Sequence, residues 1–248
     1  MALFVDGNPS QITDLANYES SIVEVAATEG IDLTAKLTVA ALEIGLELQR
    51  FLVQQLGGQQ YMLGNVAVTE GLQQWHTLLA LAITFRDAHF QQLNDRYKQK
   101  WKEYERLAKA AGSMVLDTGV GLVFSPLAKP VQPLLGQVGG NQPARTYYVR
   151  VAWVNANGVE SAASETTALT TMEGTALTVR AIGAPAASTG WNVYAGLLDD
   201  RVTRQNNAPL ALGNTWTLPA TGLATGTAPG SGQTPEYYLR HIPVLQRG

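Results

Sequence analysis

The feature that most constrains this fold is a helical stripe that runs without a proline from Gly71 to Ala111. Along it, apolar and aromatic side chains recur about every 3.6 residues on average, which is the repeat of an α-helix. Thr69 can cap its start and Gly112 can end it. We therefore predict one very long helix of about 60 Å, which needs packing partners to be stable. The stripe consists of Leu72, Trp75, Leu79, Ile83, Phe90, Leu93, Tyr97, Trp101, Tyr104 and Ala108.

The two halves of this helix differ in the surroundings that they require. The first half, up to Phe85, is apolar on nearly all sides, so we expect it to be buried. The second half is charged apart from one line of apolar, mostly aromatic residues, which we call the aromatic seam. A projecting helix with such a seam suggests assembly with other subunits. The seam, our candidate subunit interface, comprises Phe90, Leu93, Tyr97, Trp101 and Tyr104.

Two shorter helical patterns precede the long one. The first runs from about Thr13 to Glu29, and the second from Asp32, a capping residue, to about Leu56. With the long helix they predict an antiparallel helical domain over residues 1–112. Residues 113–142 mix apolar side chains with glycines and prolines that exclude a long helix, so we expect an extended crossing linker there.

The hydrophobic period changes to two from Tyr147 onward. Residues 147–154 alternate like a strand, and Asn155 to Gly158 is a hairpin signal. Further short strands separated by turn residues predict a β-sandwich over residues 143–218. The predicted fold class is therefore α+β and multidomain, with an N-terminal helical domain and a C-terminal sandwich.

The last segment, residues 219–248, begins with a stretch rich in Gly, Thr and Ala that we expect to be mobile or laid on a surface. It becomes apolar again near its end, and apolar residues after a flexible tether usually dock on another surface. The candidate docking residues are Tyr237, Tyr238, Leu239, Ile242, Val244 and Leu245.

Charge is distributed unevenly along the chain. Residues 1–70 carry nine acidic and two basic side chains, whereas residues 71–112 carry four and seven. These two parts are expected to attract one another, within a subunit or between neighbours. No cysteine, signal peptide or membrane-length apolar run is found, so we predict no disulfide, no thiolate metal site and no membrane partner.

No constellation in the sequence predicts catalysis. The three histidines, His76, His89 and His241, are too far apart to share a metal, and Glu43 with Glu47 resembles a solvated helix face. The glycines near 119–121 lack the third glycine of a dinucleotide site, and no Gly-x-Ser-x-Gly elbow occurs. We predict no enzyme activity, no cofactor and no metal.

Basic residues interleave with the aromatic seam and offer a surface on which DNA phosphates and bases could lie. Acidic residues in the same stretch favour the alternative, a solvated helix face with a packed seam. The acidic first 70 residues also argue against a DNA-binding protein. The basic residues are Arg96, Lys98, Lys100, Lys102, Arg106 and Lys109.

Several stretches resemble structural proteins of tailed bacteriophages. Trp75-His-Thr, Phe85-Arg-Asp-Ala-His and Gln91-Gln-Leu-Asn-Asp-Arg-Tyr-Lys-Gln-Lys-Trp-Lys-Glu-Tyr-Glu resemble helical proteins encoded among such genes, as do Tyr18-Glu-Ser-Ser and Gly30-Ile-Asp-Leu-Thr-Ala-Lys-Leu. The part from Pro143, with Tyr147-Tyr-Val-Arg-Val, Asn157-Gly and Gly190-Trp-Asn-Val-Tyr, is similar to fibronectin-III/immunoglobulin-like modules appended to phage virion proteins. Together these resemblances cover most of the chain.

The resemblance implies a head-to-tail adaptor (connector) protein of the virion neck, assembled in the host cytoplasm. Such adaptors form rings, commonly dodecameric, whose helical domains build the wall and whose C-terminal segments often reach into the portal. The implied partners are further copies of the chain, the portal protein, tail or nozzle proteins, fibre proteins, and double-stranded DNA that passes through the channel without sequence-specific binding.

A second class of function stays open from the sequence. The sandwich could be a carbohydrate-binding or adhesin module of a tail fibre or baseplate, with Trp153, Trp191 and Trp216 stacking on sugars. Such a site needs at least two of these rings exposed on one face. The alternative for each ring is a position in the sandwich core.

Overall fold

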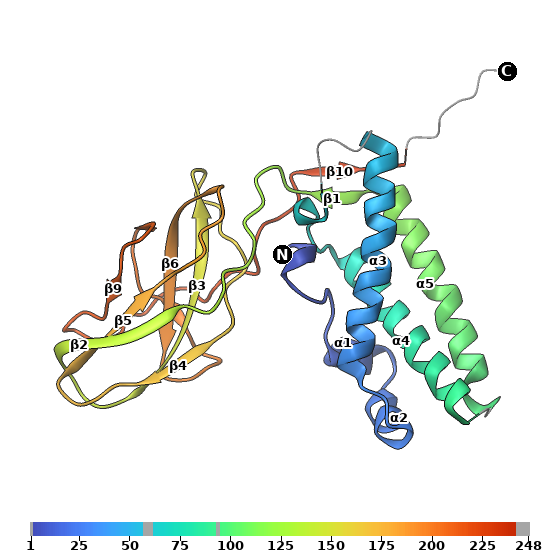
Figure 1. Cartoon of the computed structure of the whole chain (residues 1–248), viewed down its shortest axis with the longest axis horizontal. Helices are drawn as coiled ribbons and strands as arrows, with labels where there is room; N and C mark the ends of the chain where they lie inside the picture. The colour runs from blue at the N-terminus through green and yellow to red at the C-terminus, as the bar shows by residue number, and fades with distance from the viewer. Residues whose placement is uncertain (1, 57–61, 93–94, 242–248) are drawn as a thin grey trace. The chain divides into compact units, whose positions relative to one another are not determined.

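The computed structural model describes residues 2–56, 62–92 and 95–241 of the chain. The chain forms two compact units, an α+β arrangement in which helices and strands are largely separated (Figure 1). The helical unit contains Gly7–Phe124 and Pro235–Gly248, and the sandwich unit contains Met1–Asp6 and Ser125–Thr234. The two units are therefore interleaved along the sequence, and neither coincides with one of the predicted ranges.

The helical unit is built around a central helix, α4. This helix packs against each of the other four helices of the unit, and most extensively against α5. The helices are α1 (Ile12–Tyr18), α2 (Ile22–Glu29), α3 (Leu33–Leu56), α4 (Glu70–Gln92) and α5 (Lys98–Thr118). A two-stranded sheet of β1 (Val120–Leu122) and β10 (Tyr237–Leu239) completes the unit.

Several helix ends follow signals in the sequence. The predicted helix from Thr13 to Glu29 is instead divided into α1 and α2, and Gly112, the predicted stop, lies inside α5. The backbone N–H groups of Thr34 and Ala35 donate to the Asp32 carboxylate at 2.8 and 3.2 Å, which confirms Asp32 as the cap of α3. Gly30 adopts a left-handed conformation with φ 67° and ends α2. Leu72 N–H donates to Thr69 Oγ1 at 3.3 Å, so Thr69 caps α4 as predicted.

The prediction of one very long helix over residues 71–111 is wrong. The stripe is divided between α4 and α5, which lie side by side as a hairpin, with a short 3₁₀ turn at Asp95–Tyr97 before α5 (Figure 1). Gly112 in α5 lies directly against the Trp75 ring near the start of α4. The sequence at the turn contains Asp95, a poor helix former, and folding back lets the aromatic residues bury themselves against the apolar first half.

The predicted crossing linker, residues 113–142, is not a single element. Residues up to Thr118 form the last turns of α5, and β1 follows in the helical unit. The remainder leads into β2 (Leu134–Gln142), the first strand of the sandwich unit. The proline-rich stretch between 125 and 133 has no regular secondary structure, in agreement with the exclusion of a long helix.

The sandwich unit consists of antiparallel strands in two sheets. One sheet has the order β2-β5-β9, and the other has the order β4-β3-β6-β7 with β8 also paired to β6. The central pair β3 and β6 aligns Val151 with Val193 and Trp153 with Trp191. The remaining strands are β3 (Thr146–Asn155), β4 (Thr167–Thr170), β5 (Thr175–Arg180), β6 (Ser188–Gly196), β7 (Thr203–Arg204), β8 (Leu210–Ala211) and β9 (Trp216–Thr217).

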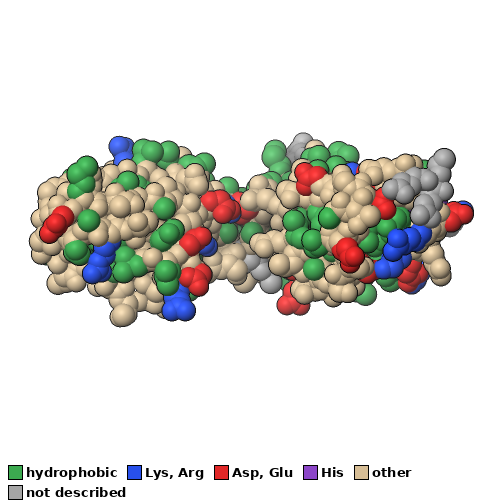
Figure 2. Space-filling view, turned by 90° about the horizontal axis from the view of Figure 1, so that it is seen from below, with side chains coloured by type: hydrophobic (Ala, Val, Ile, Leu, Met, Phe, Trp, Pro, Cys, Tyr) green, Lys and Arg blue, Asp and Glu red, His purple; other side chains and the backbone are tan. Residues whose placement is uncertain are grey.

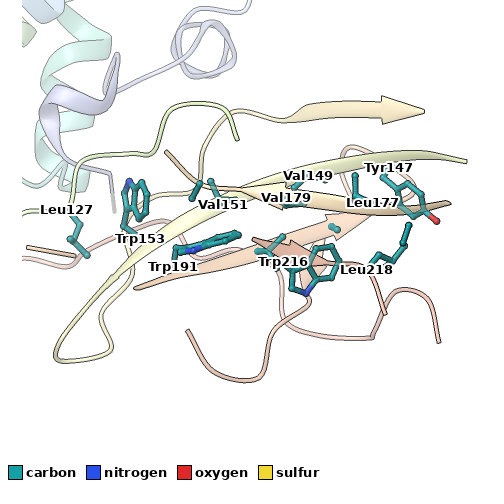
Figure 3. Packing of buried hydrophobic residues seen from close by; sticks show 14 residues of the cluster. Leu127, Tyr147, Val149, Val151, Trp153, Leu177, Val179, Trp191, Trp216 and Leu218 are labelled. Atoms are coloured by element: carbon teal, nitrogen blue, oxygen red, sulfur yellow. The ribbon is translucent and has the colours of Figure 1, made fainter. Parts of the chain in front are cut away.

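One hydrophobic core holds these sheets together. Side chains from β3, β5, β6 and β9 meet in it, and Leu127 joins from the segment before β2 (Figure 3). The stretch that follows β9 is laid on this unit: Arg204 N–H donates to Thr227 O at 2.8 Å, and Leu127 N–H donates to the buried Gln233 side chain at 2.6 Å. Residues up to Thr234 therefore belong to the sandwich unit, which extends beyond the predicted end at residue 218.

Candidate interaction surfaces

The aromatic seam closes the α4–α5 hairpin. Phe85 stacks on Tyr104 with ring centroids 5.6 Å apart and planes 4° apart, and Trp101 contacts the rings of His89 and Phe90. Tyr97 is buried and its hydroxyl donates to Glu29 at 3.1 Å. Of the candidate interface residues, only Phe90 is largely exposed among those described, and Leu93 lies outside the described residues. The expectation that the seam is free for a neighbouring subunit is therefore corrected.

The basic residues around the seam are matched by acidic ones within the chain. Lys98 pairs with Asp95, Lys102 and Lys109 pair with Glu105, and Arg106 pairs with Glu103. Lys102 also lies over the Trp101 ring, 3.9 Å from its centroid. Figure 2 shows acidic, basic and hydrophobic side chains intermixed on the face that it presents, without a continuous basic tract. These pairs favour the solvated helix face over a phosphate-binding surface.

An ion pair also joins the acidic first part of the chain to α5. Lys100 Nζ lies 2.5 Å from Glu19, which also accepts hydrogen bonds from Ser21 and Tyr104. Burial raises the pKa of Glu19, but the hydrogen bonds outweigh it and the pKa lies below its ordinary value. Burial and the Glu19 charge raise the pKa of Tyr104 to about 12. The predicted attraction between the two parts thus operates within the subunit.

A cleft of about 580 Å³ opens between α3, α4 and α5, and we call it the three-helix cleft. Its floor includes the buried side chains of Trp75, Ala82 and Ile83. The predicted carboxylate pair Glu43 and Glu47 lines one wall instead of a fully open face. Charged residues of both signs line the cleft, namely Glu43, Glu47, Arg50, Arg86, Glu105 and Lys109.

A second surface, which the sequence reasoning missed, follows the outer side of α3. Four aliphatic residues on it are exposed, whereas Ile44 and Leu48 on the opposite side are fully buried. These residues are three, four and seven positions apart, which is an average repeat of 3.5 residues along the helix. This second apolar repeat, next to that of the buried residues, is the signal in the sequence that could have identified them. We call these residues the α3 ridge: Val39 (37% exposed), Leu42 (65%), Leu46 (71%) and Val53 (53%).

The predicted docking tail begins as part of the helical unit. Strand β10 pairs antiparallel with β1, and Leu239 is buried there. Tyr237 and Tyr238 are about half exposed. His241 N–H donates to Leu116 O at 3.2 Å, so the described end of the chain lies against α5. The other candidate docking residues, Ile242, Val244 and Leu245, lie outside the described residues.

The sandwich tryptophans do not form a sugar platform. Trp153, Trp191 and Trp216 are all buried in the core, with exposed fractions of 2%, 1% and 7% (Figure 3). The Trp191 indole N–H also donates to Ala211 O at 3.3 Å. The condition set for a carbohydrate site, two exposed rings on one face, is therefore not met by these residues.

His76 is fully buried in the helical unit and has partners for both ring nitrogens. Nε2 lies 2.9 Å from Leu37 O, which can only accept, so Nε2 carries the proton and Nδ1 accepts from the Ser10 hydroxyl at 2.5 Å. Burial lowers the pKa of His76 to about 4. Because Ser10 is also buried, this pair has no access to a substrate and ties the N-terminal segment to α3 and α4.

Residues 2–56, 62–92 and 95–241 contain no group of three or more histidine and carboxylate side chains placed to hold a metal ion. None of the helices described combines the length and the apolar character that crossing a membrane requires. Comparison with known proteins found no protein-family model and no curated protein that matches this chain.

Proposed function

We propose that this chain is a structural subunit of a head-to-tail adaptor, an oligomeric ring in the neck of a tailed bacteriophage. The observation that carries the proposal is the α3 ridge, whose four aliphatic side chains are exposed along one helix of the helical unit. Contiguous exposed apolar patches mark interaction sites, and these four side chains lie along one side of a single helix. The resemblance of the helical segments to phage structural proteins supports the same role.

The proposed architecture assigns a role to each unit. The helical unit builds the ring wall around the channel, through which double-stranded DNA passes without sequence-specific contact. The sandwich unit, with its two antiparallel sheets, is proposed to be an immunoglobulin/fibronectin-III-like module that decorates the neck and meets fibre proteins. The chain acts in the virion, after assembly in the host cytoplasm, and its role is structural and not catalytic.

The proposed partners are further copies of the chain in a dodecamer, the portal protein and the tail or nozzle proteins. For the portal we propose the half-exposed Tyr237 and Tyr238 of β10 together with Ile242, Val244 and Leu245 beyond it. The carbohydrate-binding alternative is not carried forward, because the three tryptophans on which it depended are core residues.

The test is the mass of the purified protein in solution by light scattering, with negative-stain images of the same peak. We expect a closed ring of many copies, formed by the protein alone or after addition of the portal protein of the same phage. A monomer that stays monomeric with portal present would overturn the proposal. A compact trimer would also overturn it and would point to a fibre protein.

A further inference from the structure

The three-helix cleft has the form of a helix bundle that lacks one member. Helix α4 packs on α3 and on α5, while the cleft between α3 and α5 leaves their facing sides open to solvent. Its floor is apolar and its rim carries charges of both signs, which is the usual layout of a protein interface. A helix with an apolar edge, laid along the cleft, would complete an arrangement of four helices.

The α3 ridge is an apolar side of a helix of the kind that could fill this cleft. Its residues follow the 3.5-residue repeat with which one helix packs into the groove of others. Among the helices described, α1 and α2 span only seven and eight residues and already pack on α4, and α5 forms a wall of the cleft. Of the helices in the described part of the chain, only α3 combines several turns with a line of exposed aliphatic side chains.

The ridge cannot occupy the cleft of its own subunit. Helix α3 is a wall of that cleft through Glu43, Glu47 and Arg50, and the ridge lies about a quarter turn away from these residues around the helix axis. A second copy of the chain is therefore the occupant that the geometry favours. Ridge and cleft are different surfaces of one unit, so the contact is heterologous and propagates from copy to copy until it closes.

Charge supports the same occupant. Glu43, Glu47, Arg50 and Arg86 have no ion-pair partner within the described ranges 2–56, 62–92 and 95–241. Beside its ridge α3 carries two carboxylates and one arginine, so a docked neighbour presents charges of both signs to a rim that also has both signs. A helix flanked by charges of one sign would leave half of the rim groups unpaired.

We propose that the α3 ridge of one copy docks in the three-helix cleft of the next copy and that this contact closes the ring. The inference rests on the proposed function, because it identifies the surface through which the adaptor assembles. It also replaces the aromatic seam as the principal subunit contact. Trp101 belongs to both sets, since it lines the cleft.

The absence of cysteine from the chain permits a direct test by disulfide trapping. Leu46→Cys places one thiol on the ridge, and Leu79→Cys places one on the floor of the cleft. When the two variants are mixed and oxidised, we expect a disulfide-linked dimer that contains one chain of each. A matched mixture of Leu79→Cys with Val23→Cys, an exposed position on α2, should give at most background.

Other occupants would appear as different products of the same experiment. A dimer of Leu46→Cys with itself, formed in preference to the mixed dimer, would mean that two ridges pack together and would overturn the inference. Trapping of Leu79→Cys by Val244→Cys in place of Leu46→Cys would assign the cleft to the C-terminal segment and would also overturn it.

A double variant tests whether the ridge contact is required for assembly. Leu42→Glu combined with Leu46→Glu should reduce the mass in solution to that of a monomer. Because both side chains are mostly exposed, the subunit should keep its fold and the helical circular dichroism signal should stay unchanged. Met172→Glu, on an exposed position of the sandwich unit, serves as the control and should still assemble.

The failures of the two proposals differ in this assay. A double variant that still forms rings would overturn the ridge contact and leave the adaptor assignment standing. An unmodified protein that is monomeric at every concentration, with and without portal, would overturn both.

Discussion

At the scale of single residues, buried polar and small side chains define how the helical unit packs. His76 carries two hydrogen bonds inside the unit, and its proton affinity is reduced because the charged imidazolium would be buried. The sequence showed a histidine on a helix, too far from the other histidines to share a metal. It did not reveal Ser10 as a partner, because that contact joins residues 66 positions apart.

The pKa of His76 predicts a pH dependence of stability. The unfolded chain takes up a proton at this residue below about pH 6.5, whereas the folded chain does so only near pH 4, so stability falls as the pH is lowered through this window. The shift corresponds to about 3 kcal/mol, fully expressed at pH 4 and below. Urea unfolding at pH 7.5, 5.5 and 4.5, followed by the helical circular dichroism signal, measures it.

The control for this prediction is a histidine on the surface. His76→Gln should lower stability at neutral pH and flatten the loss between pH 6.5 and 4, while His241→Gln should keep the slope of the unmodified protein. The same slope in the His76→Gln variant would show that other groups cause the pH dependence.

Gly112 gives a second residue-scale prediction. A Cβ at this position would lie 2.8 Å from the Trp75 ring, closer than the packed hairpin allows. Although alanine favours a helix over glycine by about 1 kcal/mol, we expect Gly112→Ala to destabilise the protein by about 1–3 kcal/mol, because overpacking outweighs propensity. Gly64→Ala, where no atom lies within 4 Å of the new Cβ, should be nearly neutral in the same urea titration. Equal midpoints for the two variants would contradict the tight packing of α4 on α5.

At the scale of elements, local signals predicted some helix ends, but not the break between α1 and α2, the end of α5 beyond Gly112, or how the helices pair. Asp32 and Thr69 act within a few residues of their own position, and the sequence identified both. The break before α5 has no proline or glycine, and it depends on Phe85 stacking against Tyr104, which only the folded hairpin brings together. Because the sequence does not show this hairpin, it predicted that the aromatic seam contacts a neighbouring subunit, whereas the partners of the seam lie in the same chain.

The pairing of β10 with β1 was equally invisible in the sequence. Two three-residue strands separated by more than a hundred residues carry no period that reveals them. Docking of the apolar chain end on the portal stays a prediction, and the described part of that end pairs with β1 within the helical unit.

The β10 strand predicts an element-scale effect on stability. Leu239→Ala removes a buried side chain from the β1–β10 sheet and should destabilise the helical unit by about 2–5 kcal/mol. Tyr237→Ala, on the same strand but about half exposed, should change stability by less than about 1 kcal/mol. Urea unfolding of both variants checks the difference. A Leu239→Ala midpoint that matches that of Tyr237→Ala would mean that β10 does not hold the chain end to the unit.

At the scale of the whole molecule, the α+β class and the order of the helical and β parts were predicted, but the division of the chain was not. Residues 1–6 belong to the sandwich unit, and the chain returns to the helical unit after Thr234. The composition of the sequence does not reveal this return, because the segment from Pro235 to Leu239 is too short for its composition to be distinguished from that of a tail.

The measurement that tests the adaptor assignment most directly is the position of the protein in the virion. Antibodies raised against the purified chain and labelled with gold would be bound to intact phage particles and imaged by electron microscopy. The account predicts label at the junction of head and tail. Label on the fibres or the baseplate, or particles that lack the protein altogether, would contradict it.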